Sequence, residues 1–534
     1  MEDFAHLYDF WFANPHYWFG SNSDQDSQID KLFSHLFSVE INEELLVLDK
    51  KYGVGVILLY DQISKHIQRA KPNFLPIDSI SELAQKYCLS VYTKWNTELT
   101  PNEFCFVMLV FRHKKTFLDV KFVIQETWSR LKTCDKTVQP IYKRFLRATY
   151  ERAIVQTQNT QPIKYCPSLQ SGDVDSKFDQ LIKTHSSILD EKCFQKLKSL
   201  PTGKKSLIQK IKSELAKLSN EKFILSISGG VDSMICSWIL SVNKIDFCCV
   251  HINYFNRPES DEEEQFVVDW CNLLNVDLYV RKIDEINRPE CMEWELRDLY
   301  ENYTRNVRYL TYLKVSEHKS NQVILAHNQD DCFENILTNI SKKSKYDNLT
   351  GMEFNSETNF LGHVINFIRP MLSITKSEIY QFAHTIKIPF LWDSTPKWSQ
   401  RGKIRDEVRP VLEKWNNNLI EGFFELSAQA KESNKIVELY VNEWIKKIVD
   451  MTIVMSIPEL PITKLFWKLL LEKLKFKCSP HSLEGLINFL VRFSNKKIKQ
   501  DINAEIKYQL NKYTQIKLIL LVDECVKLSF CNST

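Results

Sequence analysis

The stretch Phe223–Cys236, which reads F-I-L-S-I-S-G-G-V-D-S-M-I-C, constrains the fold of this chain more than any other. Its first residues, Phe223–Ile227, are apolar and have the composition of a strand, whereas Met234–Leu240 is typical of a helix. The segment S-G-G-V-D-S at 228–233 separates them. A strand, a glycine-rich turn and a helix together bring backbone N–H groups and the positive end of the helix against a phosphate. We therefore predict a phosphate-binding turn here.

The side chains of this turn add chemistry that an ordinary glycine turn, the structural alternative, lacks. The hydroxyls of Ser228 and Ser233 can donate hydrogen bonds to phosphate oxygens. The carboxylate of Asp232 repels phosphate unless Mg²⁺ lies between the two. The turn is not a G-x-x-x-x-G-K-[ST] loop, because no lysine follows its second glycine. The predicted phosphate-binding residues are Ser228, Gly229, Gly230, Val231, Asp232 and Ser233.

The segment S-G-G-V-D-S resembles the S-G-G-x-D-S pyrophosphate loop of the N-type ATP pyrophosphatases. The resemblance implies a Rossmann-like PP-loop domain with an α/β parallel sheet. It also implies an enzyme that splits ATP between its α and β phosphates and adenylates a carbonyl oxygen. ATP and Mg²⁺ are the cofactors that follow, with Asp232 as the metal ligand.

Composition bounds the rest of the molecule. At 534 residues the chain is too long for a single core, so we expect several domains. A hydrophobic content of 44% and a charged content of 26% are typical of a soluble globular protein. The net charge of +3 means that a basic surface can arise only from uneven distribution. The 14 cysteines include no C-x-x-C pair, no signal peptide pattern is seen and no apolar run is long enough to span a membrane, which together favour a cytoplasmic protein.

Residues 1–150 are rich in aromatic residues and have helical periodicity. The apolar run Val54–Tyr60 leads into D-Q-I-S-K-H-I-Q-R at 61–69, which we interpret as a helical core with a polar end. The order D-F-W-F, W-F, L-L-Y-D-Q-I-S-K-H-I-Q-R and Phe104–His113 resembles domain-of-unknown-function family 924. That family is all-helical, so the resemblance implies an all-α domain but supplies no reaction. Lys114-Lys115 stand where the family usually has Ser-Glu.

Residues 151–220 are interpreted as a polar linker with helices, and a strand–helix alternation typical of a parallel sheet covers 221–415. After Phe223–Ile227, the expected strands are Ile245–His251, Val276–Val280 and Gln322–Ala326. In such sheets a ligand lies beyond the carboxyl ends of the strands. Residues 416–534 are expected to form a small mixed α/β region with RNA contacts.

Two further motifs follow strands, so we expect them to share one crevice with the turn. The first runs from His251 to Ser260 and includes Asn253 and Arg257. The second, A-H-N-Q-D-D-C-F-E-N at 326–335, opens a helix. Its carboxylates suit a helix N-terminus, which is the simple interpretation, and equally suit Mg²⁺ or a substrate ammonium.

Basic residues downstream are candidates for phosphate contacts, although solvated helix arginines are as common. Arg305 and Arg308 lie on one helical segment, Arg369 precedes a proline, and 393–405 mixes cations with a tryptophan, as nucleic-acid surfaces do. The predicted substrate or nucleic-acid residues are Arg257, Glu334, Arg305, Arg308, Arg369, Asp393, Lys397, Arg401, Lys403 and Arg405.

As an ordered series, these motifs resemble the tRNA(Ile)-lysidine synthetase family. The residues that carry the resemblance are S-G-G-V-D-S, H-x-N-Y-x-N-R-x-x-S, A-H-N-Q-D-D-C-x-E-N, R-P-M-L and R-G-K-I-R, over about residues 220–415. The resemblance implies that the wobble cytidine of tRNA(Ile) with a CAU anticodon attacks ATP and that lysine then displaces AMP to give lysidine. It implies Asp232, His327, Asp330 and Asp331 as catalytic residues, and His251 and Asn253 as further ATP-binding residues.

The chain departs from that family at Tyr254 and Asn328, where histidine is usual, and at Arg401-Gly402, where Arg-Asn is usual. Two other functions therefore remain open. A tRNA thiolase adenylates a base in the same way, but usually needs a cysteine pair, and here Cys291 is followed three residues later by Trp294. A non-catalytic RNA-binding or scaffold protein is the other, in which the N-terminal helices recruit a protein partner.

Overall fold

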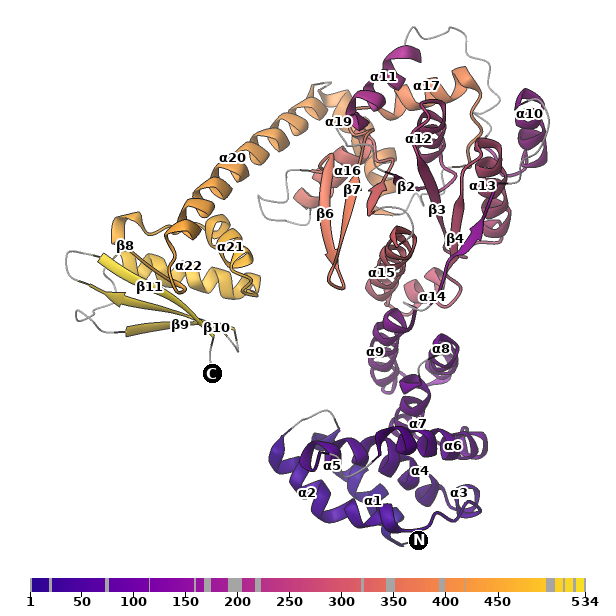
Figure 1. Ribbon diagram of the computed structural model, residues 1–534, viewed down its shortest axis with the longest axis vertical. Helices are drawn as coiled ribbons and strands as arrows, with labels where there is room; N and C mark the ends of the chain where they lie inside the picture. Colours follow the sequence, from indigo (N-terminus) through magenta and orange to yellow (C-terminus); the bar gives the residue numbers. More distant parts are fainter. Residues whose placement is uncertain are drawn as a thin grey trace. The chain divides into compact units, whose positions relative to one another are not determined.

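The computed structural model describes residues 2–18, 22–72, 76–114, 116–157, 160–167, 174–190, 204–216, 222–317, 321–341, 351–392, 399–416, 418–495, 505–511, 514–521 and 525–532 (Figure 1). They fall into two compact units. The first comprises Met1–Leu325, Ser356–Ile368 and Phe382–Trp392. The second comprises Ala326–Asn355, Arg369–Gln381 and Asp393–Thr534. The expected fold class, an all-α region followed by a parallel-sheet domain and a small mixed region, is confirmed.

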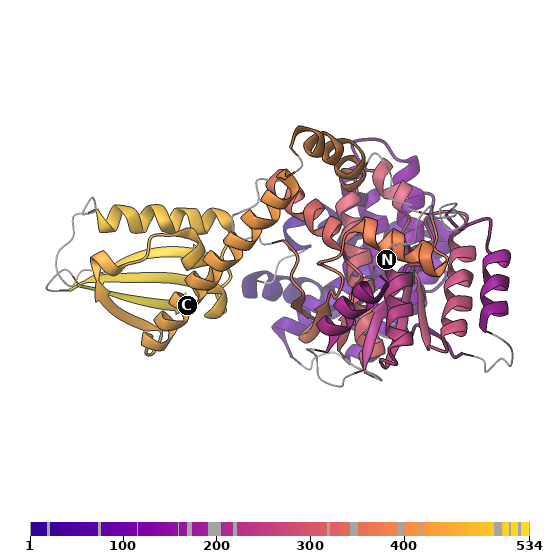
Figure 2. The same cartoon turned by 90° about the horizontal axis from the view of Figure 1, so that it is seen from above.

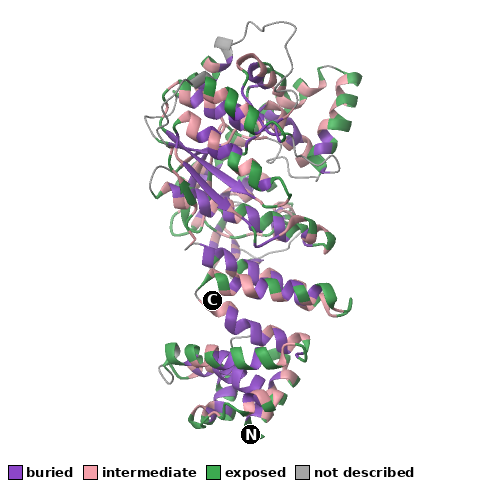
Figure 3. Cartoon of the chain, turned by 90° about the vertical axis from the view of Figure 1, so that its right-hand side faces the viewer, coloured by how far each residue is buried: buried purple, intermediate pink, exposed green. Residues whose placement is uncertain are grey.

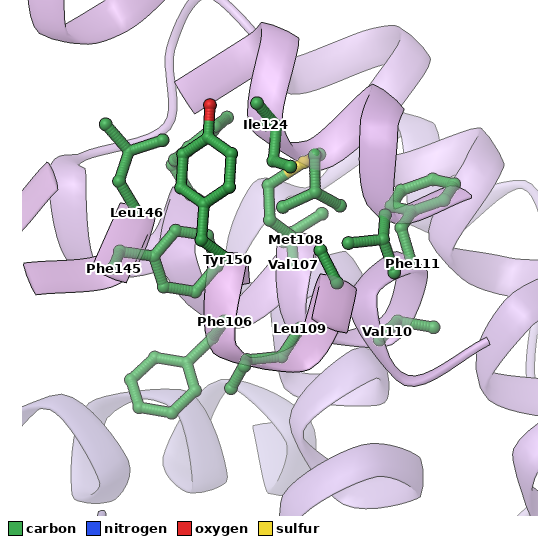
Figure 4. Packing of buried hydrophobic residues seen from close by; sticks show 14 of the residues in the cluster. Phe106, Val107, Met108, Leu109, Val110, Phe111, Ile124, Phe145, Leu146 and Tyr150 are labelled. Carbon is green, nitrogen blue, oxygen red and sulfur yellow. The ribbon is translucent and has the colours of Figure 1, made fainter. Parts of the chain in front are cut away.

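The first unit begins with an all-helical domain. Aromatic and branched side chains from its helices form one core, part of which is drawn in Figure 4, where Phe106, Phe145 and Tyr150 pack with Ile124. Thr100 begins α7 with a capping box, in which Glu103 reaches back to the Thr100 N–H. The elements are α1 (Glu2–Ala13), η1 (Pro15–Tyr17), α2 (Ser23–Phe33), η2 (Ser34–Ser38), α3 (Leu45–Leu48), α4 (Lys50–Leu58), η3 (Leu59–Ile63), α5 (Ser64–Ala70), α6 (Ile77–Trp95), α7 (Pro101–His113), α8 (Phe117–Thr133) and α9 (Gln139–Thr157).

The segment at 61–69 is the polar end of a helical core, as the sequence predicted, but part of it is buried. Asp61, Gln62 and His66 are all buried. Asp61 and Gln62 lie in a π-helix, η3, between α4 and α5. The wider turn of a π-helix aims polar side chains inward that a regular helix would place elsewhere, and such turns often occur at functional sites.

A seven-stranded sheet forms the rest of the first unit. Its order is β1-β4-β3-β2-β5-β7-β6, and β4, β3, β2, β5 and β7 run parallel to their neighbours. The segment expected as a linker contributes the antiparallel edge strand β1. The strands are β1 (Ile163–Tyr165), β2 (Phe223–Ser226), β3 (Phe247–Asn253), β4 (Leu278–Lys282), β5 (Gln322–Ile324), β6 (Asn355–Phe360) and β7 (His363–Ile368).

Helices pack on this sheet and bury its central strands, which are coloured as buried in Figure 3. β3 and β4 each start and end two residues later than the sequence predicted. α12 contacts β2, α13 contacts β3, and α15 contacts β2, β3 and β7. The helices are α10 (Val174–Thr184), α11 (Lys204–Leu215), α12 (Val231–Val242), α13 (Ser260–Leu274), α14 (Arg288–Glu293) and α15 (Arg297–Ser316).

The helical domain and the sheet share one hydrophobic core. Tyr150 of α9 lies at their junction, where its ring packs edge-on against Tyr303 with the ring centroids 4.9 Å apart. Its hydroxyl donates to the Glu285 carbonyl at 2.9 Å and accepts from Trp128 Nε1 at 3.0 Å. Four ion pairs surround this junction, and in each the cation belongs to α8 or α9. They are Lys121–Asp284, Lys132–Glu290, Lys143–Glu295 and Arg147–Asp298.

The second unit holds the motif at 326–335 and the C-terminal region. Four antiparallel strands in the order β8-β11-β10-β9 form a small sheet, and α22 packs on β9 (Figure 2). The elements are α16 (Gln329–Ser341), α18 (Gln400–Lys403), η6 (Ile404–Val408), α19 (Arg409–Trp415), α20 (Leu419–Lys447), β8 (Thr452–Ser456), η7 (Ile457–Glu459), α21 (Lys464–Lys473), α22 (Pro480–Ser494), β9 (Glu505–Asn511), β10 (Thr514–Leu520) and β11 (Cys525–Asn532). α17 (Lys376–Ile386) contributes residues to both units.

Candidate functional site

The predicted phosphate turn follows β2 and leads into α12. Gly229 has a φ of +80°, which L side chains rarely adopt, and a Cβ at this position would lie 2.4 Å from Leu391 Cδ1. The Leu391 N–H donates to the Gly229 carbonyl at 2.9 Å, so the turn is held from behind. Gly230 then precedes the first residue of α12. Glycine is therefore required at 229 by both backbone conformation and space.

Two serines close this turn on itself. Ser233 Oγ accepts the Ser228 N–H at 3.1 Å and donates to the Gly230 carbonyl at 2.9 Å. Ser228 Oγ accepts the Gly230 N–H at 3.3 Å and lies 3.2 Å from Ser233 Oγ. These bonds hold the turn at the N-terminus of α12, where the helix dipole and the free N–H groups favour an anion. Asp232, in the first turn of the same helix, adds the carboxylate that the sequence singled out.

His251 lies beside the turn, near the carboxyl end of β3. Its Nδ1 is 3.0 Å from the Ile227 carbonyl, and only 6% of the residue is exposed. Burial lowers the pKa of His251, although the bond to Ile227 and the charge of Glu264 oppose this. The neutral ring therefore donates from Nδ1 and leaves Nε2 as a hydrogen-bond acceptor.

Asn253 makes several hydrogen bonds within the chain, and the ATP contact that the resemblance implied for it stays a prediction. Its Nδ2 donates to Glu264 Oε2 at 2.8 Å and to the Ser260 carbonyl at 3.2 Å, and its Oδ1 accepts the Phe255 N–H at 2.9 Å. These bonds tie the end of β3 to the start of α13. In this structure Asn253 shapes the loop that holds Phe255 at a φ of +47°.

The predicted arginines of the first unit differ in what they contact. Arg257 pairs with Glu263 at 2.8 Å, and Arg305 is exposed on α15. Arg308 lies beside Tyr309, with its guanidinium 5.8 Å from the ring centroid, and its buried Nε has no hydrogen-bond partner among the described residues. Burial works against its positive charge, but the neighbouring Tyr312, whose hydroxyl donates to Ser226 Oγ at the end of β2, raises the pKa of Arg308. Arg308 thus remains a cation close to the strand that enters the phosphate turn.

In the second unit, the three carboxylates of the 326–335 motif are each paired with an arginine. Arg401 donates to both Asp331 and Glu334. Arg405 Nε donates to Glu334 Oε1 at 3.0 Å. Glu334 is buried, with its side chain 4% exposed, and bonds of this kind to charged groups are the strong ones. These three carboxylates and the arginines that bind them, Arg401, Arg405 and Arg409, are called the carboxylate–arginine cluster.

Arg409 completes the cluster and is the functional candidate that our sequence analysis missed. Its Nη1 donates to Asp330 Oδ2 at 2.6 Å, and its Nε donates to Glu413. A signal for it was present, because Arg401, Arg405 and Arg409 are spaced four residues apart along one helical segment. The simple interpretation of the motif is also partly correct, since Asn328 and Asp331 exchange side-chain-to-backbone bonds as an N-cap of α16.

The other predicted residues of the second unit lie at its edges. Arg369 Nε is 3.3 Å from His327 Nδ1, and Arg369 Nη1 donates to the Glu353 carbonyl at 2.9 Å. Lys403 is exposed on α18. Asp393 and Lys397 lie outside the described residues. The expectation that 326–335 shares a crevice with the phosphate turn stays a prediction.

A cavity of about 720 Å³ opens next to the carboxylate–arginine cluster. Arg409 and Glu413 line one side of it, and Glu421 and Glu425 of α20 line another, with Phe424 between them in sequence. Acidic groups around an apolar ring suit a ligand that carries a positive charge on an aliphatic stem.

Cysteine and membrane features complete the description. All 13 cysteines in the described ranges are free thiols. Burial raises the pKa of the Cys291 thiol to about 12, so it is held as the unreactive thiol. Within the described residues no group of three or more His, Cys, Asp or Glu side chains is arranged to hold a metal ion. Among the helices of those residues, none is both long and apolar enough to cross a bilayer.

Comparison with known proteins gives two family matches. Residues 204–412 match the model of the PP-loop domain, and residues 7–164 match the model of a bacterial protein of unknown function, DUF924. The sequence is 25% identical over 305 residues to the tRNA(Ile)-lysidine synthase of Malacoplasma penetrans, with 55% of this chain and 96% of that protein covered. It is 30% identical over 214 residues to the synthase of Aster yellows witches'-broom phytoplasma, with 38% and 44% covered. The chain thus spans less than half the length of the second relative.

Among solved structures, a U34-tRNA thiolase from Methanococcus maripaludis with its [4Fe-4S] cluster is similar to 43% of this chain and 79% of its own. The sequence identity is 17% and the TM-score is 0.35. At these values the similarity says nothing about activity.

Proposed function

We propose that this chain, which joins a PP-loop domain over residues 204–412 to a DUF924 domain over residues 7–164, is an ATP-dependent tRNA-modifying ligase. In the proposed reaction, the 2-carbonyl oxygen of a cytidine attacks the α phosphate of ATP and pyrophosphate leaves. The ε-amine of lysine then displaces AMP and gives lysidine. The cytidine is the wobble base of tRNA(Ile) with a CAU anticodon.

One observation carries this proposal: the S-G-G-V-D-S segment forms a closed turn at the N-terminus of α12, where a helix favours an anion. A leaving pyrophosphate needs donors that are already in place, because reorganising them during the reaction would raise the barrier. The bonds between Ser228, Gly230 and Ser233 supply that order. The relatives named tRNA(Ile)-lysidine synthase support the choice of base and amine.

Mg²⁺ fits this turn. It commonly binds proteins through one or two carboxylates and takes its remaining ligands from phosphates and water. Asp232 supplies one carboxylate at the N-terminus of α12. Bound there, the ion would neutralise charge on the phosphates. His251 offers its Nε2 to a donor of the nucleotide, while Asn253 keeps the neighbouring loop in shape.

Lysine brings an ammonium group, which calls for carboxylates. Asp330, Asp331 and Glu334 are the proposed partners, and the ammonium has to compete with the arginines that hold them. Arg401 is the easiest to displace, because half of its side chain is exposed. The acidic cavity beside Arg409 offers the lysine stem an apolar surface at Phe424. His327 or one of the carboxylates then takes the proton that the amine must lose before it attacks.

The tRNA is proposed to contact the C-terminal region, with Arg257, Arg305 and Lys403 as further phosphate contacts. Lys464, Lys468 and Lys473 lie on α21 near buried Phe466 and Trp467. Each of these lysines also has an acidic neighbour within the unit, so a solvated helix face is the competing interpretation. Because the substrate is a tRNA, we expect the protein in the cytoplasm.

The thiolase alternative is disfavoured by the cysteines of the chain. The pKa of Cys291 is raised to about 12 by burial, whereas sulfur chemistry needs the thiolate. Burial also raises the pKa of Cys332. The scaffold alternative is disfavoured by the turn itself, because Ser228, Gly230 and Ser233 keep the closed geometry that a phosphate site requires.

The experiment that tests the proposal is ATP-dependent incorporation of labelled lysine into a panel of tRNA transcripts. We expect label in tRNA(Ile) with a CAU anticodon, and a loss of at least about 100-fold in Asp232→Ala, the size of effect seen when one charge-stabilising group is removed. Asp246→Ala is the matched control, because Asp246 precedes β3 and pairs with Lys222 on the surface.

The products separate the alternatives. AMP formation that depends on tRNA, without lysine incorporation, would retain adenylation and reject lysine, and sulfide would then be tried. Binding of tRNA without any AMP or label would reject the ligase proposal in favour of a binding module.

A further inference from the structure

The helical domain carries a basic cluster that the proposed reaction does not use. It is formed by Lys65 of α5, Arg112 and His113 of α7, and Arg152 of α9, around the buried Asp61 of η3. These residues come from three segments that are distant in sequence. We call them the basic cluster.

Asp61 holds the cluster together and is itself fully occupied. Its Oδ1 accepts from His113 Nδ1 at 2.9 Å and from Lys65 Nζ at 3.2 Å, and its Oδ2 accepts from Gln62 at 2.5 Å. Burial works against the ionised carboxyl, but His113 and Lys65 together keep the pKa of Asp61 below its usual value. The bond to Nδ1 orients the His113 ring, and about a third of its side chain is exposed (35%), so Nε2 is left for another group.

Both arginines have a donor without a partner in the described part of the chain. Among those residues, neither Nη1 of Arg112 nor Nε of Arg152 has a hydrogen-bond partner, and both atoms are buried. Arg112 is held over the ring of Phe145, 5.1 Å from its centroid, so its position is fixed without an anionic partner. Native proteins rarely bury an unpaired charged donor unless a ligand or water completes it.

The electrostatics connect these groups into one neighbourhood. Burial lowers the pKa of Arg112, the Asp61 charge raises it, and the like charge of Arg152 lowers it again. Lys65, Arg112 and Arg152 carry three positive charges. Asp61 and the exposed Glu151 carry two negative charges. A ligand with more than one negative charge and several acceptor oxygens would satisfy the donors and the excess charge together.

We propose that the helical domain binds a phosphate group at the basic cluster, with Arg112 and Arg152 as its principal donors and Lys65 and His113 at the rim. The phosphate belongs either to a small free phosphoester or to the backbone of an RNA. Arginine forks suit phosphate oxygens, and a phosphate supplies three acceptors at once. The proposal concerns a site outside the PP-loop domain and does not depend on the proposed lysidine chemistry.

The test is calorimetric titration of the full chain with inorganic phosphate. All variants carry Ser228→Ala and Ser233→Ala, so that the turn at α12 contributes less binding. We expect this background to bind phosphate, and Arg112→Gln/Arg152→Gln added to it to weaken binding at least about tenfold. Lys31→Gln/Lys136→Gln is the matched control, since it removes two exposed lysines from the same domain and should leave affinity unchanged.

A second variant guards against misfolding. Lys65→Gln alters only the rim, because the Lys65 side chain is 45% exposed and His113 still pairs with Asp61, and we expect it to reduce phosphate affinity while the melting temperature stays near that of the background. The proposal is overturned if the background does not bind phosphate, or if both cluster variants bind as tightly as the control.

Two probes then identify the source of the phosphate. Filter binding of a tRNA transcript should weaken in Arg112→Gln/Arg152→Gln if the phosphate belongs to RNA. Unchanged tRNA binding, together with lost binding of inorganic phosphate and AMP, assigns the cluster to a small phosphoester.

Discussion

An alanine in place of Gly229 in the phosphate turn would lower stability for two separate reasons. Gly229 has a left-handed φ of +80°, and its missing Cβ leaves the space that Leu391 fills. Gly362 has a similar φ of +84°, but no atom lies within 4 Å of the position of its Cβ. The two glycines therefore separate backbone strain from crowding.

We predict that Gly229→Ala lowers stability more than Gly362→Ala does. Both changes add strain of about 1 kcal/mol for a left-handed residue, but only Gly229→Ala also displaces Leu391. Thermal unfolding of the two variants checks this, and ATP–pyrophosphate exchange should fall only in Gly229→Ala. Equal melting temperatures would show that Leu391 moves aside without cost.

His251 makes stability depend on pH. Its folded pKa lies below the unfolded value of about 6.5, because burial disfavours the charged ring. Below pH 6.5 the unfolded chain binds a proton at His251 that the folded chain does not bind. The contribution of neutral His251 to the free energy of unfolding is therefore present at pH 7.5 and is lost as the pH falls towards the folded pKa.

We predict that the stability advantage of wild type over His251→Asn shrinks by up to about 1.4 kcal/mol per pH unit below pH 6.5. Asparagine keeps a donor for the Ile227 carbonyl but does not titrate. Thermal unfolding of both proteins between pH 7.5 and 5.5 measures the difference, in which the other titrating groups cancel. A difference that is constant with pH would contradict the burial argument.

The sequence predicted the residues of the phosphate turn whose contacts are with near neighbours in the chain. Ser228 and Ser233 were found because the turn is contiguous, and its bonds span only a few positions. Leu391 was not found, because its contact with Gly229 joins positions far apart in the chain. The bonds of Asn253 to Ser260, Glu264 and Phe255 were not foreseen either, because only coordinates reveal which groups an amide contacts.

At the scale of elements, buried polar groups join the helical domain to the sheet. The Tyr150 hydroxyl lies between Trp128 Nε1 and the Glu285 carbonyl, so its removal leaves one donor and one acceptor unpaired. The ion pairs around it are mostly exposed, and such pairs contribute about 0–1 kcal/mol each.

We predict that Tyr150→Phe destabilises the first unit by about 1–3 kcal/mol, the cost of unsatisfied buried partners. Tyr440→Phe is the control, because Tyr440 is 47% exposed on α20. Calorimetric melting compares the two. No effect from Tyr150→Phe would mean that water replaces the hydroxyl.

Helices and strands could be predicted where the hydrophobic periodicity extended over many residues. The helices of the first 150 residues and the strands around the phosphate turn were recognisable from periodicity. β1 was not, since three residues with little burial carry no period. η3 was missed as well, because a π-helix places Asp61 and Gln62 inward, against the polarity of the sequence.

For the whole molecule, the order of an all-α domain, a parallel-sheet domain and a small mixed α/β region was predicted and is confirmed, whereas the antiparallel pairing of the last sheet was not predicted. The shared core of the helical domain and the sheet was not, because the sequence suggested a polar linker between independent domains. The predicted linker gave no sign of this junction. Its contacts are made by aromatic and charged residues of α8, α9 and α15.

That junction has a consequence for synthesis on the ribosome. Arg147 and Asp298 are separated by 151 positions, so the face of α9 is made long before its partner. At about 5–20 residues per second, translation takes roughly 8–30 s to cover that distance. During this interval the newly made helices present an uncovered aromatic surface, which a chaperone would have to protect.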